Sequence, residues 1–148
     1  MAQKEFKLEQ VLSYRREVEK KCTRDFAIAR EEYESACTML DEEIDSVNQL
    51  DQDVQQQQRE GISAVQLQLY SDFFQRKSLD IKLHRLETEN LNCKMDEKRE
   101  ILVEAAKEKK ALEILKEKKA LEHRRELAEK ERLFLEEIAL RNKLHGNR

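Results

Sequence analysis

Apolar residues follow one face of a helix along the first third of the chain. The steps between them are three or four residues and average about 3.6, the period of an α-helix. Leu8, Val11, Leu12 and Tyr14 extend this face toward the N-terminus. The pattern predicts an amphipathic helix from about residue 4 to about residue 57. The face is formed by Val18, Cys22, Phe26, Ala29, Tyr33, Ala36, Leu40, Ile44, Val47, Leu50 and Val54.

A polar stretch then interrupts the apolar face and favours a turn. Residues 55–60 carry no apolar side chain, and Gly61 follows them. Glycine readily adopts the left-handed backbone conformation that ends many helices. Ser63 is a suitable N-cap for a second helix. We therefore predict a turn over about residues 58–63.

A second helix is predicted from about residue 64 to about residue 144. The chain has no proline and only two glycines, so no other strong helix breaker interrupts this stretch. The apolar face thins out from Lys116 to Glu126 and then returns. Its main positions are Val65, Leu69, Tyr70, Phe73, Phe74, Leu79, Ile81, Leu83, Leu86, Leu91, Met95, Leu102, Ala105, Leu112, Leu115, Ala120, Leu121, Leu127, Phe134, Leu135 and Ile138.

Two helices joined by a short turn lie side by side in opposite directions. The predicted fold class is therefore all-α: a long antiparallel two-helix coiled coil, or α-hairpin, forming a single domain over residues 1–148. A turn centred on Gly61 would place Phe26 opposite Asp96, so an apolar partner for Phe26 requires a small shift of register. The second helix is the longer one. We expect its last 25 or so residues to project as a single helix, which is marginal alone and suits docking to a partner.

The composition excludes a compact core and several classes of partner. Charged residues make up 41% of the 148 residues and aromatic residues 5%, too little large apolar surface for a globular core. Disorder is the competing interpretation, mainly for the two ends, but the net charge of −3 and the periodic apolar residues favour helices. Acidic and basic residues are interleaved, so no nucleic-acid surface is predicted. With no membrane-spanning run and no signal peptide, we expect a cytoplasmic protein.

Catalytic and cofactor chemistry is not expected. A nucleotide site needs a glycine-rich loop, and the only glycines are Gly61 and Gly146. The histidines and cysteines lack the spacing of metal or redox sites, and a slender rod offers no pocket for a Cys–His nucleophile. We predict a non-enzymatic protein without cofactor or metal, with free thiols on or near the seam between the helices. These residues are His84, His123, His145, Cys22, Cys37 and Cys93.

Three stretches carry motifs in a fixed order along the chain. Residues 6–15 have the sequence FKLEQVLSYR, residues 105–118 have AAKEKKALEILKEK, and residues 135–139 have LEEIA. They resemble the F-x-L-x-x-V-L-x-Y-R opening, the basic A-x-x-E-R/K-K-x-L-E-x-L-K stretch and the closing L-D-E-x-A signature of the FliJ family of bacterial flagellar export proteins. Glu136 stands where Asp is usual in the closing signature.

The resemblance implies a component of the flagellar type III export apparatus that is similar to the central stalk of rotary ATPases. Such a protein is expected to bind and stimulate the hexameric export ATPase. It is also expected to contact the cytosolic domain of the membrane export gate protein and to bind export chaperones. It would be a monomer, held at the inner membrane through its partners only. A stalk of a virulence-type secretion system and a structural, self-assembling coiled coil are the alternatives.

The resemblance also assigns two groups of partner-binding residues. Tyr70, Phe73 and His84 match the gate side, although Lys77 and Asp80 depart from the apolar pattern of the family there. The alternative roles are a seam position for Phe73, an ordinary polar helix position for His84 and solvated helix charges for the lysines of the ATPase side. The ATPase side comprises Lys107, Lys109, Lys110, Lys116, Leu135 and Ile138.

Overall fold

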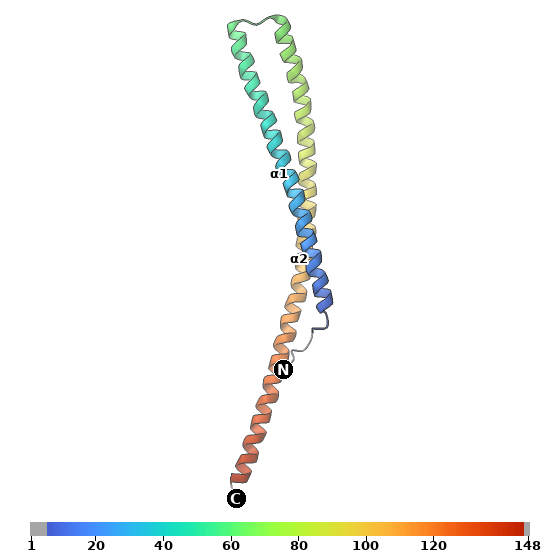
Figure 1. Cartoon of the computed structure of the whole chain (residues 1–148), viewed down its shortest axis with the longest axis vertical. Helices are drawn as coiled ribbons and strands as arrows, with labels where there is room; N and C mark the ends of the chain where they lie inside the picture. Colours follow the sequence, from blue (N-terminus) through green and yellow to red (C-terminus); the bar gives the residue numbers. More distant parts are fainter. Residues whose placement is uncertain (1–5, 147–148) are drawn as a thin grey trace. The chain divides into compact units, whose positions relative to one another are not determined.

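The computed structural model describes residues 6–146, which contain two α-helices and no strand. Helix α1 spans Glu9–Glu60 with 52 residues, and α2 spans Ala64–Gly146 with 83 residues, so the second helix is the longer one, as predicted (Figure 1). The predicted helical residues 4 and 5 lie outside the described range. Residues 6–8 form a turn in which the Glu9 N–H donates to the Phe6 carbonyl oxygen at 3.0 Å, so α1 begins later than predicted.

The connection between the helices is short and has the predicted chemistry. Gly61 has a φ of 103°, a backbone conformation that favours glycine. Ser63 caps α2, because its Oγ accepts a hydrogen bond from the Gln66 N–H at 3.2 Å. The turn is shorter than predicted, since α1 continues to Glu60. One reason is that Gln56 donates to the Glu60 carboxylate one helical turn later, at 3.2 Å.

Contacts divide the described chain into two units, which are considered separately. Unit 1 consists of residues 6–20 and 104–146, and unit 2 consists of residues 21–103. Unit 2 contains the turn and the parts of α1 and α2 that flank it. Over the residues that the structure describes, neither helix has a stretch long and apolar enough to cross a bilayer.

The shielded positions of each helix alternate by three and four residues, the spacing of a coiled-coil seam. With the exception of His84, which is exposed, every position in these two series is buried or half-buried. On α1 the series is Leu12, Arg15, Glu19, Cys22, Phe26, Ala29, Tyr33, Ala36, Leu40, Glu43, Val47, Leu50 and Val54. On α2 it is Tyr70, Phe74, Lys77, Ile81, His84, Thr88, Leu91, Met95, Lys98, Leu102, Ala105, Lys109, Leu112 and Lys116.

Cross-helix contacts establish the register within each unit. In unit 2 the Arg99 guanidinium lies 5.5 Å from the centroid of the Phe26 ring. Phe26 therefore contacts a cation of α2, and the register is shifted by a few residues from a turn centred on Gly61. In unit 1, Lys116 pairs with Glu9 and Lys109 with Glu19. The partner of Glu19 has a lower residue number on α2 than the partner of Glu9, so the two helices are antiparallel in unit 1.

Candidate functional site

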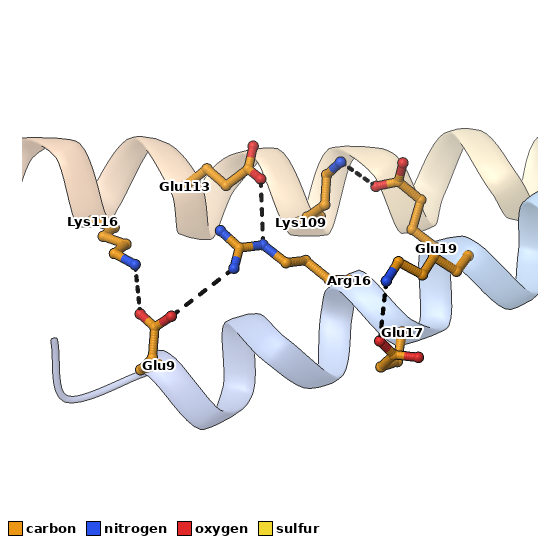
Figure 2. Close-up of polar contacts among 8 residues, drawn as sticks. Glu9, Arg16, Glu17, Glu19, Lys109, Glu113 and Lys116 are labelled. Carbon is orange, nitrogen blue, oxygen red and sulfur yellow. Dashed lines mark hydrogen bonds and ion pairs between the residues drawn. The ribbon is translucent and has the colours of Figure 1, made fainter.

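An ion-pair network joins α1 to α2 in unit 1. Lys116 Nζ lies 2.8 Å from Glu9 Oε2, and Glu9 also faces Arg16 at 4.0 Å. Arg16 in turn lies 3.8 Å from Glu113 of α2. Figure 2 shows that the charge alternates from one side chain to the next, with Glu9 and Arg16 on α1 and Glu113 and Lys116 on α2. Of these four residues only Lys116 belongs to the seam series, and the other three flank the seam, where coiled coils commonly place ion pairs between helices.

A second pair lies beside this network at seam positions. Lys109 Nζ lies 2.6 Å from Glu19 Oε2, and both side chains are about one-quarter exposed (Figure 2). The hydrogen bond to Glu19 raises the pKa of Lys109 above its ordinary value, so the pair favours the charged form of the lysine. Arg15 and Glu108 form a further cross-helix ion pair. The packed apolar content of unit 1 is small, with Leu12 and Ala105 as its buried hydrophobic residues.

The four lysines predicted for the ATPase side have two different environments. Lys109 and Lys116 face α1 and pair with its glutamates. Lys107 is exposed and lies 3.4 Å from Glu104 of its own helix, and Lys110 is also exposed. Lys107 and Lys110 are therefore accessible to a partner. Lys109 and Lys116 are engaged within the chain.

Beyond Lys116, α2 is exposed to solvent. Among the described residues of this C-terminal segment, 117–146, only His123 is half-buried, and all the others are exposed. The segment nevertheless carries large apolar side chains, which include the predicted site residues Leu135 and Ile138. Their exposed fractions range from 37% to 73%. These side chains are Leu121, Leu127, Leu133, Phe134, Leu135, Ile138, Leu140 and Leu144.

The apolar side chains of the C-terminal segment lie on more than one side of the helix. Leu127, Phe134 and Ile138 are separated by seven and four residues, which places them on one face. Leu133, Leu140 and Leu144 repeat the same spacing, about 120° around the helix axis from the first face. Charged residues lie between these apolar positions and form ion pairs within the segment, as Arg132 does with Glu129 and Glu136. The segment therefore exposes apolar strips on a charged helix, a pattern that suits contact with a partner.

Two of the three residues predicted for the gate side line open grooves near the turn in unit 2. Phe73 contributes to a groove of about 390 Å³ together with Met39, Val47, Leu50 and Lys77. Tyr70 contributes to another of about 470 Å³, together with Val54, Leu67 and Phe74. The rings of Phe73 and Phe74 meet edge to face with centroids 6.1 Å apart. Phe73 is half-buried and lines a groove, and it lies beside the seam position Phe74 rather than in the seam series.

His84, the third residue predicted for the gate side, is held by α1. Its Nδ1 lies 2.5 Å from Glu43 Oε2, and Lys77 lies 3.4 Å from the other oxygen of the same carboxylate. The hydrogen bond with His84 lowers the pKa of Glu43 and raises the pKa of His84. The structure thus brings His84 and Lys77 together around an acid that lines the Phe73 groove.

The thiols and acidic groups of residues 6–146 do not form a metal site. Cys22 is buried, Cys37 half-buried and Cys93 exposed, and all three are free. The prediction of thiols on or near the seam therefore fits Cys22 and fails for Cys93. No group of three or more His, Cys, Asp or Glu side chains within the described residues could hold a metal ion.

The acidic partners on α1 were missed by sequence reasoning. The apolar stripe with a period of about 3.6 selects Val18 and Ile44, whereas the seam series contains their neighbours Glu19 and Glu43. A strict alternation of three and four residues would have found both glutamates, because it needs no apolar residue at each position.

Comparison with known proteins gives one match. A family model described as flagellar FliJ protein matches residues 3–148. No curated protein and no solved structure matches the chain.

Proposed function

Because this chain belongs to the FliJ family and is thus a component of the flagellar export apparatus, we propose that it binds the export ATPase ring through its C-terminal segment and stimulates ATP hydrolysis. The protein itself is proposed to be non-enzymatic. One observation carries the proposal: the C-terminal segment exposes large apolar side chains on at least two sides. A single groove covers one face of a helix, whereas a ring surrounds all of them.

The exposed charges of α2 support the same orientation. Lys107 and Lys110 are accessible in the basic stretch that precedes the C-terminal segment, and cations of this kind steer a protein toward an acidic rim. Leu135 and Ile138, exposed by 57% and 37%, are proposed to make apolar contacts inside the ring. In this account Lys109 and Lys116 stabilise the protein itself in its free form.

The turn end of unit 2 is proposed to bind the cytosolic domain of the export gate protein. Its two grooves combine aromatic and aliphatic walls with a charged cluster at Glu43, Lys77 and His84. Such grooves accept single apolar side chains of a partner, with the charged cluster adding specificity. Export chaperones are further proposed partners, and the protein would reach the inner membrane through these contacts from the cytoplasm.

Flagellar export is preferred to the two alternatives. The matching family is the flagellar one, which favours it over a virulence-type system. A self-assembling coiled coil would leave its seam for a second copy. Here, within each unit, α1 and α2 occupy the seam themselves, which supports a monomer.

The proposal is tested by removing the C-terminal segment. A variant that ends at residue 119 keeps both partners of every cross-helix ion pair described above. With the purified export ATPase, we expect the full chain to raise the rate of ATP hydrolysis and the shortened chain to lose that effect. Circular dichroism checks that the shortened chain remains helical. Equal stimulation by the two proteins would contradict the proposal.

A further inference from the structure

The face of α2 that packs against α1 in unit 1 does not end where α1 ends. On this face Lys109 pairs with Glu19 and Lys116 with Glu9 of α1. Ala105 and Leu112 are the other seam positions of α2 there. The same face continues by steps of three, four and seven residues into the C-terminal segment. The continued seam comprises Ala120, His123, Leu127, Phe134 and Ile138.

The continuity suggests what covers the exposed part. In the covered part, the occupant is an antiparallel helix that presents carboxylates to the lysines of α2, as Glu9 does to Lys116 and Glu19 to Lys109. A partner helix that used the same packing could run along Ile138, Phe134 and Leu127. It would then meet residues 6–20, which we call the N-terminal arm.

The N-terminal arm is attached in a way that allows exchange. Its seam positions are Leu12, Arg15 and Glu19, so two of the three are charged. In unit 2 the seam series of α1 is apolar or aromatic at every position except Glu43. Ion pairs between partly exposed side chains stabilise weakly and are screened by salt. The burial of apolar side chains is not screened by salt. Local opening is therefore expected first at the arm.

We propose that the N-terminal arm is an exchangeable cover, and that an acidic amphipathic helix of the export ATPase displaces it to pack along one continuous seam from Ile138 to Ala105. This inference rests on the proposed binding of the ATPase to the C-terminal segment. The incoming helix presents carboxylates to Lys109 and Lys116 in place of Glu19 and Glu9. In the free chain these two lysines are paired with Glu19 and Glu9 until the partner helix binds.

Carbodiimide cross-linking reads the position of the arm directly. The reagent activates the Glu19 carboxylate, and the Lys109 amine attacks it to form an amide, with the reagent leaving as a urea. Their atoms lie 2.6 Å apart in the free chain. The pair Glu43–Lys77 in unit 2, at 3.4 Å, is the internal control. Both cross-links are quantified by mass spectrometry in the free chain and in the fraction that co-sediments with the ATPase.

We expect the Glu19–Lys109 cross-link to fall at least fivefold in the bound fraction while the Glu43–Lys77 cross-link stays constant, a change of about 1 kcal/mol in the closed population. A bound fraction that retains the Glu19–Lys109 cross-link would overturn the exchange and leave the proposed function intact. Absence of co-sedimentation would instead refute the proposed function. In that case, amide hydrogen exchange of the free chain tests whether the N-terminal arm opens. Amides of residues 12–20 that exchange as slowly as those of residues 26–50 would refute an exchangeable cover.

Substitution of one acid tests the competition from the other side. Glu19→Gln weakens the attachment of the arm and is expected to tighten ATPase binding about threefold, because a larger fraction of the chain is open. Glu17→Gln is the matched control, since Glu17 pairs with Lys20 within the arm at 3.4 Å and does not reach α2. Equal affinities for the two variants, or weaker binding by Glu19→Gln, would contradict the displacement.

Discussion

His84 Nδ1 lies 2.5 Å from Glu43 Oε2, so an α2 imidazole and an α1 carboxylate form a contact between the two helices of unit 2. Lys77 shares the same carboxylate, and Glu87 and Asp80 act on the histidine from its own helix. The hydrogen bond with Glu43 is the main cause of the raised pKa of His84. The contact therefore depends on the protonation of a histidine whose pKa is raised above its ordinary value.

The sign of the resulting pH dependence follows from linkage. Because the pKa of His84 is raised on folding, its contribution is fully present below the unfolded value of about 6.5 and is lost as pH rises through the folded value. The pKa of Glu43 is lowered, so its contribution is lost when pH falls below its ordinary range. We expect the melting temperature to fall as pH rises above about 6.5, the ordinary pKa of histidine.

Differential scanning calorimetry of two variants checks this pH dependence. His84→Gln should flatten the fall in melting temperature, because it removes the titrating partner of Glu43. His123→Gln, in the C-terminal segment and remote in sequence from Glu43, should keep the profile of the unmodified chain. A profile that His84→Gln leaves unchanged would refute the role of this contact.

Gly61 should be sensitive to any side chain because of its backbone alone. Its φ is 103°, and a Cβ built on it would meet no atom within 4 Å. Gly61→Ala is therefore expected to destabilise the protein by about 1–2 kcal/mol through strain in the left-handed region. Gly146→Ala, where a Cβ also meets nothing, should change stability by less than about 0.5 kcal/mol. Urea unfolding followed by circular dichroism measures both, and equal effects would contradict the assigned turn.

Leu12 should dominate the apolar attachment of the N-terminal arm, because it is 0% exposed. Leu12→Ala is expected to make opening of the arm easier by about 2 kcal/mol, the low end for a buried leucine, since a two-helix seam can partly collapse. The neighbouring Val11 is 43% exposed, and Val11→Ala should cost less than about 0.5 kcal/mol. Native-state hydrogen exchange of residues 12–20 reports the difference. Similar exchange rates in the two variants would be the contrary result.

The chain should be a monomer with a single unfolding transition. Where α1 packs against α2, the seam is filled by the two helices of the same chain, and the sequence mass is 17.7 kDa. Analytical ultracentrifugation should return that mass, and a dimer of twice the mass would favour the self-assembling alternative.

Because the helices continue from one unit into the other, far-ultraviolet dichroism and tyrosine fluorescence are expected to give coincident urea curves for a single domain.

The helices and their turn were predictable because local chemistry decides them. Gly61 and Ser63 act through their own backbone and side chain, and no distant residue is needed to place them. The greater length of α2 followed from the position of this one turn. The start of α1 was less predictable. Residues 6–8 carry no helix breaker, and the Glu9–Phe6 turn that precedes the helix depends on backbone geometry.

The charged parts of the seam could not be read from apolar periodicity. Glu19 and Lys109 are ordinary surface residues in a hydropathy pattern, and only the register brings them within 2.6 Å. Register is a property of both helices together. An error of a few residues in the register is enough to predict Asp96 opposite Phe26, where the structure has Arg99 against its ring. The exposed apolar side chains of the C-terminal segment were visible in the sequence. Their distribution on two faces also follows from their spacing, and the structure adds that neither face is covered by α1.

Stimulation of the export ATPase by two triple variants tests the central claim most directly. Leu127, Phe134 and Ile138 are changed together to serine in one variant, and in the control the exposed leucines Leu79, Leu83 and Leu86 of unit 2 are changed in the same way. We predict that the first variant loses most of its stimulation of ATP hydrolysis, while the control stimulates the ATPase as the unmodified chain does. Full stimulation by this variant would show that the C-terminal segment does not dock through the face formed by Leu127, Phe134 and Ile138.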